Sequence, residues 1–80
     1  MKLWLLSQDH YLGMDSYDSI VVAAKNEAAA KQILPHENMK WGRNSGDSWA
    51  ESPEQVTAEL IGTAVRGTQA GVIITSFHAG

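Results

Sequence analysis

The chain has 80 residues, 44% of them hydrophobic and 19% charged, which predicts one soluble globular domain over residues 1–80 and excludes a disordered chain. The formal net charge of −3 counts against a general nucleic-acid binder, which usually presents a basic surface. There is no cysteine for disulfides or thiolate metal sites, and no apolar run approaches the roughly 20 residues of a membrane-spanning helix. We therefore expect a cytoplasmic protein that does not enter a membrane.

Lys2–Gln8 predicts the first strand, because four apolar residues stand together in it. Alternation of side chains along a strand places Leu3 and Leu5 on one face. Trp4 and Leu6 then lie on the opposite face. Because both faces are apolar, we expect this strand to be covered on both sides, by the rest of the domain or by another chain.

The following segment, Asp9–Tyr17, predicts a loop, and four residues in or beside it could bind a ligand: Asp9, His10, Asp15 and Asp18. Carboxylates combined with an imidazole are a common metal-ligand set. Their spacing here matches no such set, and Asp side chains in loops equally accept hydrogen bonds from nearby backbone N–H groups. We therefore predict no metal ion and keep these four residues as a second candidate contact surface.

Ser19–Ala24 predicts the second strand through its β-branched run, and a short helix follows. Asn26 is suited to the N-cap, since its side-chain carbonyl can accept from a free N–H of the first turn. Glu27–Leu34 is alanine-rich and contains no Gly, so helix formation costs it little. Pro35 ends the predicted helix, because its ring disfavours helical backbone at the preceding residue.

The predicted helix has one apolar stripe, formed by Ala30, Ile33 and Leu34, which we expect to pack on the sheet. Glu27 and Lys31 stand four positions apart, a spacing that allows an exposed ion pair of about 0.3 kcal/mol. The helix is therefore expected to lie back on the strand that precedes it.

Residues 36–53 are rich in Gly, Asn, Ser and Asp, which predicts a long loop. Within this loop, Trp41, Arg43 and Trp49 are the most suggestive group for partner binding, because aromatic residues and arginine are enriched in protein–protein contact sites. The same side chains could stack on single-stranded nucleic acid. A third interpretation is that the tryptophans cover the core, and we expect at least one of them to be anchored there.

Two further strands complete the chain. Glu54–Ile61 alternates apolar and polar residues, which predicts a half-solvated strand. Gly71–Phe77 has the strongest β-propensity, and we predict it as a central strand. The order β-β-α-loop-β-β predicts an α+β fold: a small four-stranded, mostly antiparallel sheet with one short helix packed on one face. The tryptophan loop or a second protomer is expected to cover the other face.

The sequence carries no recognised catalytic motif, since the G-x-S-x-G, GxxxxGK[ST] and HExxH patterns are all absent. A chain of this length also rarely encloses a pocket large enough for a substrate. We predict a non-enzymatic protein with no catalytic residue, no cofactor and no bound metal.

Four stretches resemble a family of small uncharacterised proteins encoded by phages and prophages: MKLWLLSQ, YDSIVVAAKNEAAAKQI, LIGTA and GVIITSFHAG. The resemblance covers most of the chain and is weakest in the central loop. The family has no assigned activity, so the resemblance implies only a context, a phage accessory protein that works inside a bacterial host cell.

Together these observations predict a non-enzymatic phage accessory protein that binds a host or phage protein, with inhibition of a host or defence system as one form of that role. Two alternatives stay open. One is single-stranded nucleic-acid binding through the Trp41–Trp49 loop, which the net charge disfavours. The other is a small ligand- or metal-binding dimer, and a homodimer is also compatible with the first interpretation.

Overall fold

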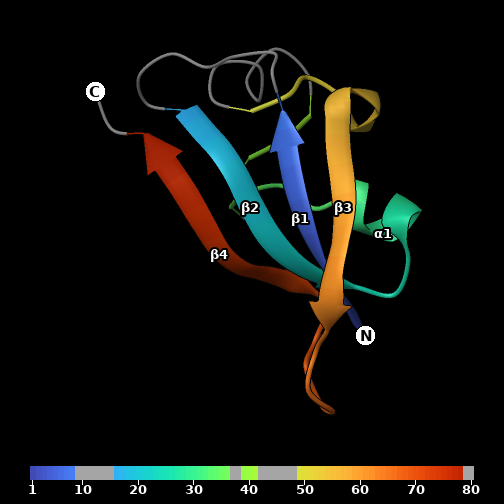
Figure 1. The fold of residues 1–80 in the computed structure, drawn as a ribbon. Helices are drawn as coiled ribbons and strands as arrows, with labels where there is room; N and C mark the ends of the chain where they lie inside the picture. The colour runs from blue at the N-terminus through green and yellow to red at the C-terminus, as the bar shows by residue number, and fades with distance from the viewer. Residues whose placement is uncertain (9–15, 37–38, 42–48, 79–80) are drawn as a thin grey trace.

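The computed structural model describes residues 1–8, 16–36, 39–41 and 49–78. Four strands form one antiparallel sheet and a short helix packs against it, which confirms the predicted α+β architecture and its order β-β-α-loop-β-β (Figure 1). The strands are β1 (Lys2–Gln8), β2 (Ser16–Ala24), β3 (Val56–Thr63) and β4 (Gly71–His78), the helix is α1 (Glu27–Lys31), and a single 3-10 turn, η2 (Pro53–Gln55), precedes β3.

The strand order is β3-β1-β2-β4, so β1 and β2 are the central strands and β3 and β4 the edges. All three neighbouring pairs are antiparallel. The prediction that the last strand is central was therefore wrong. High β-propensity indicates that a segment fits a pleated surface, but it carries no information about strand order.

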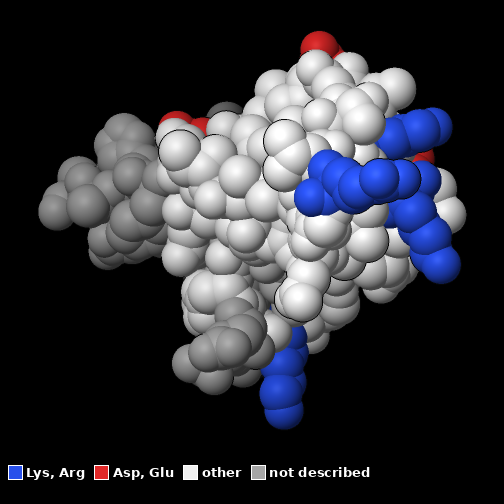
Figure 2. All heavy atoms as spheres, turned by 90° about the horizontal axis from the view of Figure 1, so that it is seen from below, with Lys and Arg blue, Asp and Glu red and all other residues white. Residues whose placement is uncertain are grey.

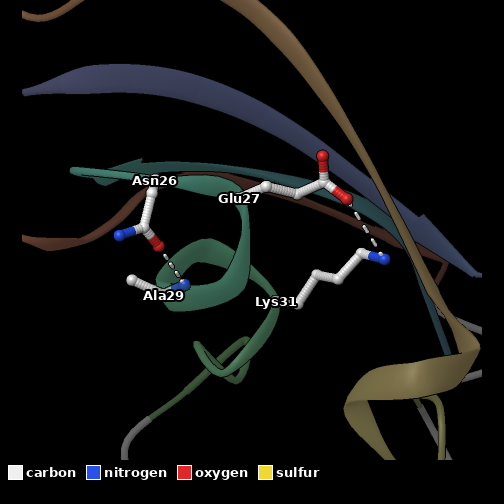
Figure 3. Close-up of polar contacts among 4 residues, drawn as sticks. All are labelled: Asn26, Glu27, Ala29 and Lys31. Carbon is white, nitrogen blue, oxygen red and sulfur yellow. Dashed lines mark hydrogen bonds and ion pairs between the residues drawn. The ribbon is translucent and has the colours of Figure 1, made fainter.

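The start of α1 agrees with the sequence, because the Asn26 Oδ1 accepts a hydrogen bond from the Ala29 N–H at 2.8 Å (Figure 3). The predicted pair also forms, with Lys31 Nζ 3.4 Å from Glu27 Oε2. The helix nevertheless ends at Lys31, three residues before the predicted end. The N–H of Ile33 donates to the carbonyl of Ala30 at 3.0 Å, so the last turn tightens and the chain leaves the helix early.

The core lies between the sheet and the layer formed by α1 and residues 49–50. Trp4 and Leu6 of β1 point into it, as the alternation predicted, and Ala30 is the buried residue of α1. Ile33 and Leu34 pack against the same cluster from beyond the helix end. The buried cluster consists of Trp4, Leu6, Ile20, Val22, Ala24, Ala30, Trp49, Ala50 and Val56.

The opposite face of the sheet carries Leu3, Leu5 and Val21, which are half-buried. In Figure 1, α1 lies behind the sheet and no described helix or strand covers the front. Trp49 belongs to the cluster on the helix side, so the expectation that the tryptophan segment covers the second face is wrong for this residue. Within the described ranges, no helix has the length and apolar character needed to cross a membrane.

Candidate functional site

The three residues predicted as the main contact site have different environments. Trp49 is 0% exposed, so its side chain is part of the core and offers no surface to a partner. This confirms that at least one tryptophan anchors the loop to the core, and Trp49 is left out of the contact surface proposed below. Trp41 is half-buried against the core, and Arg43 lies outside the described residues.

Of the second predicted group, Asp9, His10 and Asp15 lie outside the described residues. Asp18 is exposed on β2, at a bulge where the register with β4 shifts between Tyr17 and Ser19. In the part of the chain that the structure describes, no three His, Asp or Glu residues lie close enough together to hold a metal ion.

A groove on the surface lies next to β4, which is one edge of the sheet. An apolar groove of about 550 Å³ runs between the segment that follows α1 and the first residues of β4. After the helix the chain turns at Pro35, and the Met39 N–H donates to the His36 carbonyl at 3.2 Å, which places Met39 beside His36. The lining residues are Ile33, Leu34, Pro35, His36, Met39, Gly71 and Val72.

His36 is the one ionisable residue in this lining. Its ring lies 6.2 Å from that of Tyr17, at a tilt of 47°. Tyr17 belongs to β2, so this contact holds one wall of the groove against the sheet. The other wall is the start of β4, where Gly71 has φ +144°, a backbone angle that other residues rarely adopt.

Among the described strands, β4 is an edge strand with no charged residue to protect it, although a bulge at Ile73 shifts its register with β2. Within the described ranges it pairs with β2 on one side only, and no charged residue occurs between Gly67 and Phe77. Ile73 and Ile74 are 52% and 62% exposed. The other edge, β3, carries Glu59, and a charged residue on an edge strand discourages pairing with other chains. Of the two edges that the described strands form, β4 is therefore the one without a charged residue to discourage pairing with another strand.

Positive charge gathers at the same end of the sheet as the groove. Lys2 is opposite Ala24 in the register and Gly71 is opposite Ala23, so Lys25 lies just past the start of β4. Arg66 is on a turn closed by the Thr68 N–H and the Val65 carbonyl at 3.1 Å. Figure 2, which views this end from below, shows most of the Lys and Arg side chains on the side where α1 and β3 lie in Figure 1, away from the outer edge of β4.

Sequence reasoning missed the groove and the open edge, although one signal was present. The charge-free run from residue 67 to 77 is unusual in a chain with 19% charged residues. How this run should be interpreted depends on the strand order, because the same uncharged residues in a central strand would simply be part of the buried core. The groove itself depends on the early end of α1, which the apolar spacing did not reveal.

Comparisons with protein-family models, with curated proteins and with solved structures found no match to this chain.

Proposed function

We propose that the chain is a non-enzymatic interaction protein that binds an extended segment of another protein along β4 and in the adjoining groove. The observation that carries this proposal is the apolar groove of about 550 Å³ beside an edge strand that has no charged residue from Gly71 to Phe77. The groove and the edge strand each favour binding of a peptide segment, and they adjoin because Gly71 and Val72 belong to both.

Strand addition explains how such a surface would bind. An edge strand presents a row of unpaired backbone N–H and C=O groups, and an added strand satisfies them with main-chain hydrogen bonds. Side chains of the added strand alternate between the two faces, so every second one points to the groove side. Apolar side chains at these positions would contact Val72 and the wall formed by Leu34 and Met39.

The resemblance to phage and prophage proteins makes a host or phage protein the natural partner class. This part of the proposal rests on the resemblance alone, and inhibition of a host or defence system is one outcome of such binding. The nucleic-acid alternative has lost one of its two aromatic residues, because Trp49 is buried in the core. The homodimer stays a prediction, and the sheet face with Leu3, Leu5 and Val21 is a second surface on which it could form.

The proposal is tested by affinity purification of tagged protein from a bacterial host, comparing the wild type with Val72→Asp. Val72 is 37% exposed and lines the groove, so a carboxylate there opposes an apolar side chain from the partner. The matched control is Leu60→Asp, since Leu60 is 52% exposed on the other edge strand. Thermal unfolding of both variants tests whether they are folded, and only folded variants are compared.

A partner that is captured in near-stoichiometric amount by the wild type and Leu60→Asp, but lost from Val72→Asp, supports the proposal. Equal capture by all three folded proteins would place the contact elsewhere. The 260/280 nm absorbance ratio of the purified sample tests the nucleic-acid alternative in the same experiment.

A further inference from the structure

The sheet has one face that no described helix or strand covers, and this front face is turned toward the viewer in Figure 1. Successive side chains of a strand alternate between the two faces. Trp4 and Leu6 are buried on the helix side, so Leu3 and Leu5 of β1 lie on the front face. Leu5 is beside Val21 of β2 in the register, which places Val21 on the same face.

The apolar side chains of the front face form two rows that run across the strands. Leu5 and Val21 form one row, and Ile74 continues it to the margin of the sheet on β4. Leu3 and Ala23 form the neighbouring row. The two rows are centred on β1 and β2, the central strands of the described sheet, so the middle of this face is apolar.

A row of hydroxyl side chains lies on the other side of the Leu5 row. Its members follow one another in the register across all four strands: Thr57, Ser7, Ser19 and Ser76. A hydroxyl group both donates and accepts hydrogen bonds, so such a row is complementary to a copy of itself. In these three rows the charged residue is Glu59, which stands beside Leu5 on the edge strand β3 and therefore at the margin.

The front face is large enough for a stable contact between two copies. Four strands spaced about 4.8 Å apart are about 19 Å wide, and the seven residues of β1, at about 3.4 Å each, are about 24 Å long. Two such faces with interdigitated side chains bury on the order of 1,000 Å² in total, which is the area that specific protein–protein interfaces reach. With 80 residues and no cysteine the domain has a small core and no disulfide, and oligomerisation is one way in which such domains gain stability.

We propose that two copies of the chain associate through their front faces, about a two-fold axis that runs parallel to the strands. Because the strand order is β3-β1-β2-β4, this axis lays β1 of one copy over β2 of the other. Leu5 then faces the partner's Val21, and Leu3 faces the partner's Ala23, so a larger side chain meets a smaller one in both rows. The hydroxyl row faces its own copy, and the two Glu59 carboxylates lie at opposite margins of the interface.

This inference is independent of the proposed function, because the contact uses the other side of the sheet. Val72, which lines the groove, is opposite Val22 in the register, and Val22 is buried on the helix side. The dimer therefore presents two grooves, one on each outer side, and a partner that carries two copies of the recognised segment gains avidity. Pairing along β4 at high concentration would join such dimers into larger species.

The test measures the dimer dissociation constant by sedimentation equilibrium for the wild type and two variants. We expect the wild type to reach twice the monomer mass. Val21→Thr adds a hydroxyl with little change in shape, and it occurs twice in a two-fold dimer, so it should raise the dissociation constant at least about tenfold. Leu5→Glu places two carboxylates in the middle of the interface and should leave only monomers.

The matched control is Leu60→Glu, because Leu60 is an exposed residue of the same sheet but stands beside Trp4, on the helix side. It should keep the dissociation constant of the wild type. Thermal unfolding tests whether each variant is folded, and Val21→Thr, which keeps a β-branched side chain, decides the result if Leu5→Glu does not fold.

Chemical shifts of the full-length chain, followed on dilution, locate the contact. Concentration-dependent shifts of the Leu3, Leu5 and Val21 methyl groups that are absent in Val21→Thr at the same concentrations support the proposal. Shifts confined to residues 72–76 would assign the contact to the edge of β4 and overturn it. A wild type that stays monomeric at every concentration, or a Val21→Thr that dimerises as tightly as the wild type, would overturn it as well.

Discussion

The indole N–H of Trp4 donates to the backbone carbonyl of Ala24 at 3.1 Å, inside the core. Trp4 is opposite Val22 in the register, so the bond runs diagonally to the last residue of β2. Two residues later Asn26 caps α1. The bond therefore fixes the point where the chain leaves the sheet for the helix that forms one wall of the core.

This bond predicts a difference between two tryptophan substitutions of equal size. Trp4→Phe removes the donor and leaves the buried Ala24 carbonyl without it, whereas the Trp49 Nε1 has no hydrogen-bond partner among the described residues. A buried group left unsatisfied costs about 1–3 kcal/mol. We expect Trp4→Phe to lower the free energy of unfolding by about that much more than Trp49→Phe, as measured by urea denaturation.

The two variants serve as controls for each other, because each loses the same volume from a fully packed site. Equal losses of stability would mean that the Trp4–Ala24 bond adds nothing beyond packing. A larger loss in Trp49→Phe would indicate that its indole has an acceptor outside the described residues.

The N-cap of α1 gives a second prediction. Asn26→Ala removes the acceptor for the Ala29 N–H, and such a change typically costs about 1 kcal/mol. Asn26→Asp keeps an acceptor and should retain most of the stability. Lys31→Ala, which removes only the exposed pair with Glu27, should cost about 0.3 kcal/mol. Chemical denaturation of the three variants measures this order, and an Asn26→Ala as stable as the wild type would contradict it.

The local parts of the fold could be predicted from the sequence, since short-range rules decide them. Lys2–Gln8 was predicted with its observed bounds, and the Asn26 cap and the Glu27–Lys31 pair both form. The helix was predicted too long because the apolar stripe of Ile33 and Leu34 continues past its end. Those residues do pack on the core, but from a turn and not from a helix.

The candidate site could not be predicted because it depends on the strand order. β4 looks like a core strand by composition, and its place at the edge follows from how the chain crosses the sheet after α1. For Trp49 the error has the opposite direction, because a residue predicted to lie on the surface is buried. A tryptophan in a polar loop has the composition of a contact residue, yet it is among the largest fully buried side chains.

The positive-φ glycines give a third prediction. Gly67 has φ +91° and Gly71 has φ +144°, and a Cβ at either position would meet no atom within 4 Å. Alanine there is therefore penalised by backbone strain alone, by about 1–3 kcal/mol. Gly62→Ala is the matched control, since Gly62 has no positive φ and its Cβ would make an ordinary 3.9 Å contact with Leu3. Thermal unfolding should show losses for Gly67→Ala and Gly71→Ala but little change for Gly62→Ala.

The fourth prediction concerns self-association at the open edge. The run Gly71–Phe77 is uncharged, rich in β-branched residues and free of proline, which favours pairing between copies at high concentration. Ile74 is 62% exposed there, and Ile74→Lys should reduce association because a charge on an edge strand must be desolvated when another strand pairs with it.

Sedimentation velocity over a range of concentrations measures the effect, with Leu60→Lys on β3 as the matched control. Leu60 is 52% exposed but neighbours Glu59, so its edge already carries a charge and should contribute less to association. We expect the shift toward larger species to disappear in Ile74→Lys and to persist in Leu60→Lys. Association that persists in both variants would assign self-contact to the sheet face with Leu3, Leu5 and Val21, which leaves β4 free for a partner strand.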